Sequence, residues 1–250
     1  MTRRPALTVS EERGVRTLHV GGEAIQSSMR ISDPFALWLE YTRCMMSVLL
    51  FHPRPRRALA IGLGGGSVVK FLWRELPALR QRVVELDERV VIAARTHFAL
   101  PPDGERLHVE IGDGAEALSP ECCDLLVVDA YHDEEHVPQL ASAEFYDAAT
   151  LALAEPGVMV VNFMDDDRLL DEYLKRMEAA FGGRVLAMKA LYDPNVLAFA
   201  LKGFDSRISW SSLLRRAQSL ESRFDLPFPR YVSRLRGMNR VTPQELLIGP

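Results

Sequence analysis

Cysteines, long apolar runs and an excess of one charge are all scarce in this sequence. The 250 residues include three cysteines, of which Cys122 and Cys123 are adjacent, so the chain has no disulfide framework and suits a reducing compartment. It contains no CxxC motif and no Cys/His spacing typical of a metal site. The longest apolar stretch, near residues 45–51, is far too short to span a bilayer, and the first residues lack the apolar core of a signal peptide. The net charge of −4 does not favour a general nucleic-acid or membrane partner. We therefore expect a cytoplasmic protein with no metal, no nucleic-acid partner and no membrane partner.

The clearest feature that is present is a strand, glycine turn, helix and strand over residues 58–87. An apolar run at 58–61 leads into a glycine-rich turn at 62–66, a helical stretch from Ser67 and a second apolar run at 83–87. Glycines let backbone approach a ligand closely, and the amides of a helix N-terminus attract negative charge. An acid about 20 residues on, at the tip of the next strand, is where a ribose diol is hydrogen-bonded, and Glu85 fits that role. The pattern predicts a nucleoside-binding domain, although a buried strand–turn–helix without a ligand is the alternative.

The rest of the chain alternates short apolar strands with helices, which predicts an α/β fold with a mostly parallel, doubly wound sheet of the Rossmann type covered on both faces. Three segments are expected: a small N-terminal β-hairpin unit over 1–30, a nucleoside-binding catalytic domain over 31–205 and a C-terminal helical extension over 206–250 that packs on it. The strands are expected at 15–20, 23–27, 58–61, 83–87, 107–111, 123–128, 158–162, 184–191 and 196–202, with the last two as an antiparallel pair. Helices are expected from Ser32-Asp33-Pro34 to Leu50 and at 88–98, 145–154, 168–181 and 211–224. A tail that contains several prolines follows the last helix.

Three carboxylates, Glu85, Asp113 and Asp129, come at the ends of predicted strands. In an open α/β sheet, ligands bind outside the carboxyl ends of the strands. Each acid alone has an ordinary alternative as a helix cap or turn residue. Together they indicate one shared cleft.

These blocks resemble the polyamine aminopropyltransferase family, the spermidine synthase-like proteins with a class I methyltransferase-like fold. The resemblance covers roughly residues 21–202 and is carried, in family order, by residues 52–57, the glycine turn, 84–88, 111–114, 128–129 and 140–146. Ordinary methyltransferases usually carry an acid two residues before the first glycine, where this chain has Ala60, which favours the aminopropyltransferase branch.

The resemblance implies a nucleoside half and a catalytic half of the site. By resemblance, the nucleoside half comprises Gln26, Gly62, Gly64, Gly66, Glu85, Asp113 and Gly114, and the catalytic half comprises Asp129 and Tyr41. Glu85 would hold the ribose hydroxyls and Asp113 the adenine amino group, while Asp129 would match the family's catalytic acid. A carboxylate suits that task because an amine must lose a proton to attack the carbon beside a sulfonium. The implied co-substrate is decarboxylated S-adenosylmethionine or S-adenosylmethionine, the acceptor is a small-molecule amine, and the expected assembly is a homodimer.

The amine half departs from the family pattern. Gly65 stands where the family's glycine loop carries an aspartate, His132 stands where the Asp motif has its second acid, and Thr42-Arg43 follow Tyr41 where Gln/His and Glu are expected. These changes remove negative charge, so we expect an acceptor other than standard putrescine. The acidic run at 133–135 either compensates or is a solvated loop. Two other functions stay open: a methyltransferase acting on a small molecule, and a catalytically silent nucleoside-binding paralogue.

Overall fold

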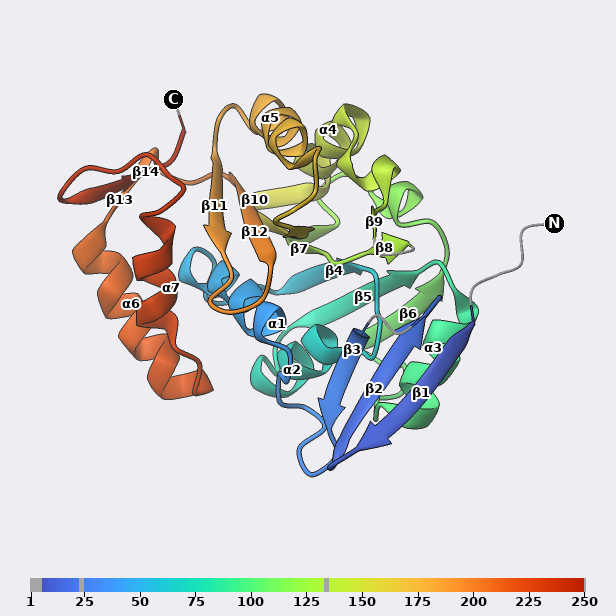
Figure 1. The fold of residues 1–250 in the computed structure, drawn as a ribbon. Coiled ribbons are helices and arrows are strands. Elements are labelled where there is room, and N and C mark those ends of the chain that lie inside the picture. Colours follow the sequence, from blue (N-terminus) through green and yellow to red (C-terminus); the bar gives the residue numbers. More distant parts are fainter. Residues whose placement is uncertain (1–5, 23–24, 133–134, 250) are drawn as a thin grey trace.

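A seven-stranded, mostly parallel sheet forms the centre of the protein (Figure 1). The computed structural model describes residues 6–22, 25–132 and 135–249, without the side chains of 131–136. The strands lie in the order β11-β12-β10-β7-β4-β5-β6. Their bounds are β4 (Arg57–Ile61), β5 (Arg80–Glu85), β6 (Leu107–Ile111), β7 (Cys123–Val128), β10 (Leu153–Met164), β11 (Val185–Lys189) and β12 (Asn195–Lys202). Strands β10, β7, β4, β5 and β6 pair in parallel, and β12 pairs antiparallel with both β10 and β11. The predicted fold class and the closing antiparallel pair are confirmed.

The chain winds in both directions from β4, so the order reverses between β4 and β7. The second and third parallel strands, β5 and β6, lie on one side of β4, and the fourth, β7, lies on the other. In a doubly wound sheet this switch point opens a crevice at the carboxyl ends of the two strands. The glycine turn follows β4 and Asp129 follows β7, so both arrive at that crevice.

Both faces of the sheet are buried, which explains the near-continuous apolar strands. Alternate strand residues enter different cores: Ala58 and Ala60 join one cluster, whereas Leu59 and Ile61 join the other. The first cluster contains side chains of α2 (Ser67–Glu75), α3 (Glu88–His97) and the C-terminal helices, and the second contains those of α4 (Ala143–Ala152) and α5 (Leu170–Ala180). Of the helices in the described ranges, none has the length and apolar character needed to cross a membrane.

The N-terminal unit is a three-stranded antiparallel sheet rather than a hairpin. Strands β1 (Leu7–Glu12), β2 (Val15–Val20) and β3 (Ile25–Arg30) pair in sequence order. A turn at Arg13 and Gly14, both with positive φ, joins the first two strands. The unit lies beside α3 (Figure 1), where the Arg16 guanidinium donates to the His97 carbonyl oxygen at 2.5 Å. Leu18 and Met29 are buried in the main core, so the small sheet shares the core of the large one.

The predicted helix from Ser32 to Leu50 is wrong in its first half. The chain forms α1 (Glu40–Met45) and then the 3-10 helix η1 (Met46–Leu50). Asp33 and Pro34 begin a turn instead, closed by the Ala36 N–H donating to the Asp33 carbonyl oxygen, and Ser-Asp-Pro is also a turn signature. The Asp33 carboxylate pairs with Arg74 at 2.9 Å rather than capping a helix.

The tail contains structure that its prolines did not suggest. The predicted helix at 211–224 is present as α6 (Trp210–Phe224), and a second helix, α7 (Phe228–Leu235), follows it. A small antiparallel pair joins β13 (Arg207–Ser209), directly before α6, to β14 (Glu245–Leu247), after α7. Prolines stand at the start of α7, where a missing N–H costs a helix nothing. From α7, Arg234 donates to the Leu191 carbonyl oxygen at 3.2 Å, which attaches the tail to the loop between β11 and β12.

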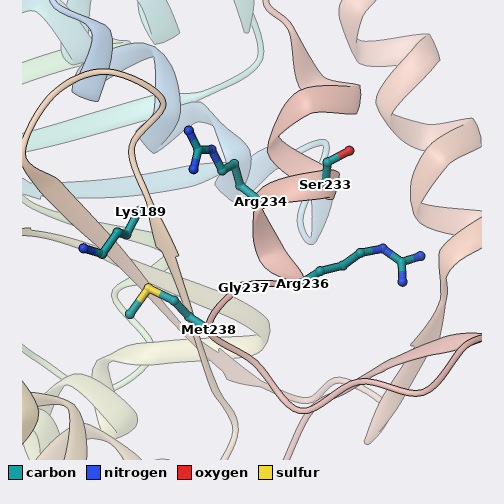
Figure 2. Close-up of a pocket in the computed structure, with 6 residues that line it drawn as sticks. All are labelled: Lys189, Ser233, Arg234, Arg236, Gly237 and Met238. Atoms are coloured by element: carbon teal, nitrogen blue, oxygen red, sulfur yellow. The ribbon is translucent and has the colours of Figure 1, made fainter.

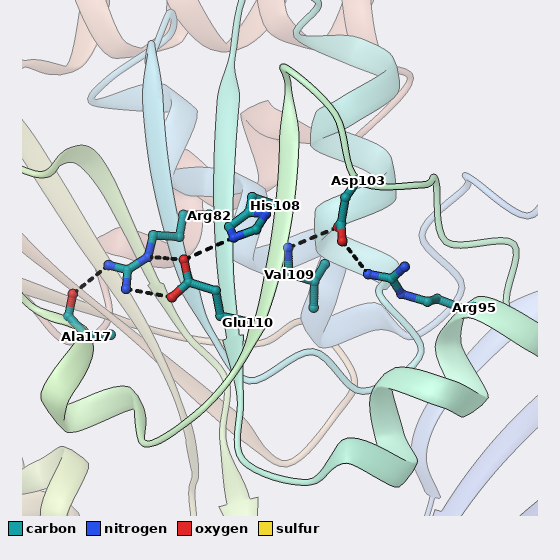
Figure 3. A network of polar contacts seen from close by, with 7 residues as sticks. All are labelled: Arg82, Arg95, Asp103, His108, Val109, Glu110 and Ala117. Carbon is teal, nitrogen blue, oxygen red and sulfur yellow. Dashed lines mark hydrogen bonds and ion pairs between the residues drawn. The ribbon is translucent and has the colours of Figure 1, made fainter.

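Ion pairs tie β6, at the edge of the sheet, to its surroundings (Figure 3). The Arg82 guanidinium on β5 binds both Glu110 carboxylate oxygens at 2.9 and 2.7 Å and donates to the Ala117 carbonyl oxygen at 2.9 Å. These bonds lower the pKa of Glu110. Ala117 ends the 3-10 helix η2 (Gly114–Ala117), so Arg82 also holds the segment that directly follows Asp113.

Lys70 is fully buried on α2, which makes stability depend on pH. Its ammonium group donates to the Phe98 carbonyl oxygen at 2.7 Å and contacts the Met29 sulfur at 3.2 Å, and it takes part in none of the ion pairs among the described residues. Burial lowers the pKa of Lys70 from 10.5 to about 7. The unfolded chain therefore holds the proton between pH 7 and 10.5 while the folded chain does not, so stability rises with pH across that window.

We expect Lys70→Met to be more stable than the wild type by roughly 2 kcal/mol at pH 7, because it removes a buried amine at the loss of one hydrogen bond. Its advantage should be constant below pH 7 and shrink by about 1.4 kcal/mol per pH unit above it. Urea unfolding of both proteins between pH 6 and 10 measures this difference. A difference that does not change with pH would contradict the assigned direction of the pKa shift.

Candidate active site

The glycine turn packs directly on the end of β7. Gly62 has φ +90°, and a Cβ atom there would lie 2.2 Å from the Asp129 carbonyl oxygen. The Gly62 N–H donates to the Val84 carbonyl oxygen at 2.9 Å, and the Asp129 N–H donates to the Ile61 carbonyl oxygen at 3.0 Å. The Gly62 position is therefore required by the packing of two strand ends as well as by room for a ligand.

Of the remaining glycines of the turn, Gly64 and Gly65 lie against β3. Gly64 has φ +53°, and a Cβ atom there would lie 3.5 Å from the Ser27 Cβ atom. Gly66, with φ +70°, is the N-cap of α2. A Cβ atom at Gly65 would lie 2.7 Å from the Ser27 hydroxyl and 2.8 Å from the Phe98 ring. The absence of an acid at position 65 is therefore also a matter of space, because the side chains of Ser27 and Phe98 already fill the volume that an aspartate would need.

Glu85 bridges the glycine turn and the start of α3. Its Oε2 accepts from the Leu63 N–H at 2.8 Å and its Oε1 from the Asp87 N–H at 3.0 Å. Burial raises the pKa of Glu85, and these two hydrogen bonds oppose that shift. A carboxylate has about four acceptor sites, so the group retains capacity for a hydroxyl donor such as that of a ribose.

Two exposed apolar side chains flank Glu85, and sequence reasoning did not single them out. Leu86 is 71% exposed and Ile111 is 56% exposed, and Ile111 pairs with Glu85 across β5 and β6. Exposed large aliphatic side chains at the carboxyl ends of strands offer an apolar surface to a flat base. The only sequence signal was their position, one residue after Glu85 and two before Asp113.

Asp113 and Gly114 lie at the next strand end. One Asp113 oxygen accepts from the Ala115 N–H at 2.9 Å, which caps η2, while the residue remains exposed. A Cβ atom at Gly114 would lie 2.2 Å from an Ile61 methyl carbon, so this glycine lets η2 pack on β4. The capping role that sequence reasoning kept as an alternative is thus present, and it leaves the carboxylate at the surface.

Asp129 and Tyr41, which are 88 residues apart, are in contact. The Tyr41 hydroxyl donates to Asp129 Oδ2 at 3.2 Å, and the Asn162 amide donates to Oδ1 at 3.0 Å. Burial raises the pKa of Asp129, and the bonds from Asn162 and Tyr41 partly offset the rise. Asn162 was missed as a site residue. Its signal was a polar residue that ends the apolar run 158–161.

Gln26 lies on β3, and its backbone carbonyl is 3.9 Å from a Cβ position at Gly64. Its side-chain Oε1 is buried, and no hydrogen bond from the described residues reaches it. A buried acceptor without a donor is costly in a folded protein. An unpaired acceptor beside the glycine turn fits a site that a hydrogen-bonding ligand completes.

The expected features of the amine half have different outcomes. His132 lies in a short pair, β8 (Tyr131–His132) with β9 (Glu135–His136), whose side chains are outside the described part of the structure. Of the acidic run 133–135, residues 133 and 134 and the side chain of Glu135 are also outside it. Arg43 follows Tyr41 by two residues, about 200° around a helix. It is close enough to Tyr231 of α7 to oppose the burial that raises the pKa of that hydroxyl. Arg43 therefore belongs to the side of α1 that faces the C-terminal helices.

A separate cavity of about 420 Å³ lies between β11 and the end of α7, and none of the nine predicted site residues lines it (Figure 2). Arg234 and Arg236 point in opposite directions, and Lys189 pairs with Asp165 at 3.3 Å. The charged groups that line this cavity therefore do not converge on a common point. Across the described residues, the His, Cys, Asp and Glu side chains form no group suited to a metal ion.

Comparison with known proteins connects this site to a family. The spermine/spermidine synthase domain family matches residues 39–189. The polyamine aminopropyltransferase of Chromobacterium violaceum is 36% identical over 98% of this chain and 94% of its own length. The chain belongs to the spermine/spermidine synthase family. The polyamine aminopropyltransferase of Neisseria meningitidis is 33% identical over 94% of this chain and 90% of its own length.

Solved structures support the fold. A probable spermidine synthase from Corynebacterium glutamicum superposes with a TM-score of 0.71 at 20% identity, covering 85% of this chain and 84% of that one. Human methyltransferase-like protein 13 in complex with SAH gives a TM-score of 0.68 at 23% identity, covering 75% and 93%. At such identities the likeness shows a fold shared by the spermine/spermidine synthase family and methyltransferases. The predicted family and its transferase class are confirmed by the sequence relatives.

Proposed function

We propose that this protein is an aminopropyltransferase that uses decarboxylated S-adenosylmethionine to alkylate a small amine. The contact of Asp129 with Tyr41 at the switch point carries the proposal, because it puts a half-buried carboxylate and a hydroxyl beside the glycine turn. The relatives named above from Chromobacterium and Neisseria are polyamine aminopropyltransferases, which supports the same reaction.

In this proposal the nucleoside lies across the carboxyl ends of β4, β5 and β6. Glu85 accepts hydrogen bonds from the ribose hydroxyls, the base lies between the exposed Leu86 and Ile111, and Asp113 meets its amino group. Gln26 would accept one donor from the ligand through its buried, unpaired oxygen. These assignments use groups whose hydrogen-bonding capacity is not exhausted within the protein.

The reaction needs one proton acceptor near the reacting carbon. The substrate amine uses its lone pair to form a C–N bond to the methylene carbon beside the sulfonium. The C–S bond breaks, its electron pair stays on sulfur, and methylthioadenosine leaves. The new ammonium group loses a proton to Asp129, whose raised pKa makes it a better base than an exposed aspartate. Tyr41 orients that carboxylate through its hydroxyl.

We expect putrescine to be a poor acceptor, with kcat/KM below about 10⁴ M⁻¹s⁻¹, the lower end of the ordinary enzyme range. The reason is that Gly65 lacks an acid and has no room for one beside Ser27 and Phe98. Initial rates with putrescine and a panel of mono- and diamines, followed by release of methylthioadenosine, measure this preference. Efficient turnover of putrescine would show that the substitution at position 65 does not control acceptor choice.

Donor identity tests the proposal against its two rivals. Calorimetric titrations compare decarboxylated S-adenosylmethionine, S-adenosylmethionine and methylthioadenosine. Tight binding and turnover of the decarboxylated donor support an aminopropyltransferase, and methyl transfer from the intact donor would replace it with a methyltransferase. Nucleoside binding without turnover on any amine would favour a silent paralogue. The homodimer and the cytoplasmic location remain predictions, and the roles assigned above depend on neither.

A further inference from the structure

Two buried asparagines form a chain of hydrogen bonds that ends on Asp129. Asn162 on β10 is 3% exposed and Asn195 on β12 is 6% exposed. The Asn195 amide nitrogen donates to the Asn162 side-chain oxygen at 3.0 Å, and the Asn162 amide nitrogen donates to Asp129 Oδ1 at 3.0 Å. Asn195 pairs with Met164, two residues beyond Asn162, in the antiparallel register of β10 and β12, so the two amides lie near each other across one strand pair.

The chemistry of the groups gives this chain a direction. An ionised carboxylate only accepts hydrogen bonds, so Asn162 must turn its NH₂ group toward Asp129. Its oxygen then faces Asn195, which must present NH₂ in turn. Asn195 thereby prevents the Asn162 amide from turning over, since the opposite orientation would leave two donors, or two acceptors, facing each other. The arrangement gives each oxygen of an ionised Asp129 one side-chain donor.

The second donor to Asp129, Tyr41, is held by the loop between β11 and β12, which ends directly before Asn195. The Asp193 carboxylate accepts from the backbone N–H of Tyr41 at 2.9 Å, at the start of α1, where no side chain of α1 itself caps the helix. The Asn195 N–H donates to the Asp193 carbonyl oxygen at 2.8 Å. Glu40 strengthens the junction, because its carboxylate accepts from the backbone N–H groups of residues 191, 192 and 193 at 3.0 to 3.2 Å.

Resting on the proposed function, we infer that the loop between β11 and β12, together with Asn195 at the start of β12, positions the reactive carboxylate. Asp193 acts through Tyr41, and Asn195 acts through Asn162. Asn162, Asn195 and Asp193 are thus positioning residues for the transfer reaction. Both oxygens of Asp129 receive their donors from groups that residues 193–195 hold.

Among the side chains that the structure describes, the other charged groups near Asp129 have separate roles. On α1, the titratable group that faces it is Tyr41, and Glu40 is turned to the backbone of residues 191–193. On β10 the facing group is the neutral Asn162, and the glycine turn contributes backbone. Asp193 is engaged with the Tyr41 N–H. A change in the titration of Asp129 after substitution in the asparagine chain therefore reports on that chain.

The test measures the pKa of Asp129 directly in the ligand-free protein, by carboxyl ¹³C NMR with the Asp129→Asn spectrum for assignment. We expect Asn162→Ala to raise that pKa by about one unit, because a hydrogen bond to the charged form is lost. Asn195→Ala should raise it less. Asn195→Asp should raise it more than Asn195→Ala, since a carboxylate at position 195 draws the Asn162 NH₂ group to itself and turns the amide oxygen toward Asp129.

A matched control is Asn239→Ala. The Asn239 side chain donates to and accepts from the backbone of Ala187 at 2.7 and 2.8 Å, away from Asp129. Its loss should lower thermal stability without moving the pKa of Asp129. Where turnover is measurable, the acid limb of the pH dependence of kcat/KM should shift upward in the asparagine variants and not in this control.

An Asp129 pKa that is the same in the wild type, Asn195→Ala and Asn195→Asp would overturn the inference. Asn195→Ala leaves both direct donors in place, so it decides the matter even where Asn162→Ala does not fold. An unchanged pKa in an active enzyme refutes the positioning role and leaves the proposed function standing. The expected pKa shifts in a protein without transferase activity would refute the proposed function instead.

Discussion

Asp129→Asn is expected to lower turnover by about 10²–10⁴-fold, the usual cost of losing a general base, while leaving donor affinity nearly unchanged. The amide keeps the shape of the side chain, can still accept from Asn162 and can donate to the Tyr41 oxygen. It cannot take the proton from the amine. Single-turnover rates and calorimetric titration with methylthioadenosine measure the two effects on one variant.

The same variant should also be more stable at neutral pH. Burial raises the pKa of Asp129, so the folded state binds a proton more readily than the unfolded state between pH 3.8 and the raised value. The ionised side chain therefore destabilises the fold above that window, and the penalty disappears as the pH falls through it. The stability gained by Asp129→Asn should be largest at pH 7 and decline in acid, as urea unfolding at several pH values would record.

An ordinary turn-capping role for Asp129 makes the opposite forecast of lower stability with activity retained. The carboxylate accepts from two side chains on other elements, which already disfavours that role. If donor affinity collapses together with turnover, Asp129 belongs to the nucleoside half and the proposed catalytic role is wrong.

Glu85→Ala is expected to weaken binding of methylthioadenosine by at least about tenfold, because a hydrogen bond to a charged group is worth roughly 1.5–3 kcal/mol. The loss of affinity should exceed that from the missing ribose hydrogen bond alone, because the carboxylate also accepts a hydrogen bond from the Leu63 N–H of the glycine turn. Calorimetric titration gives the dissociation constants directly.

Two further variants separate these contributions. Glu85→Gln keeps one acceptor oxygen and the side-chain volume, so it should fall between the wild type and Glu85→Ala. Glu88→Ala removes an exposed acid from the first turn of the adjoining helix and should leave affinity unchanged. Equal affinities for wild type and Glu85→Ala would refute the assignment of Glu85 to the nucleoside.

Local patterns were sufficient for the features that depend on neighbours in sequence. The glycines and apolar runs around residues 58–87 place Glu85 at a strand end, and parallel strands bring their carboxyl ends to one edge. The same logic placed Asp113 and Asp129 there. The helix before β4 was misjudged because Ser-Asp-Pro is compatible with both a cap and a turn, and packing selected the turn.

The sequence by itself determined the class of the sheet, the edge at which the acids gather and the family to which the chain belongs. The sheet and its edge follow from periodicity and strand ends, which are local properties, and the family follows from the resemblance of the motif blocks to known members. The tertiary structure decided which groups meet there: Tyr41 and Asn162 on Asp129, Asn195 behind Asn162, and Ser27 with Phe98 over Gly65. Each contact joins segments at least 30 residues apart and depends on side-chain direction and packing, which no short-range pattern encodes.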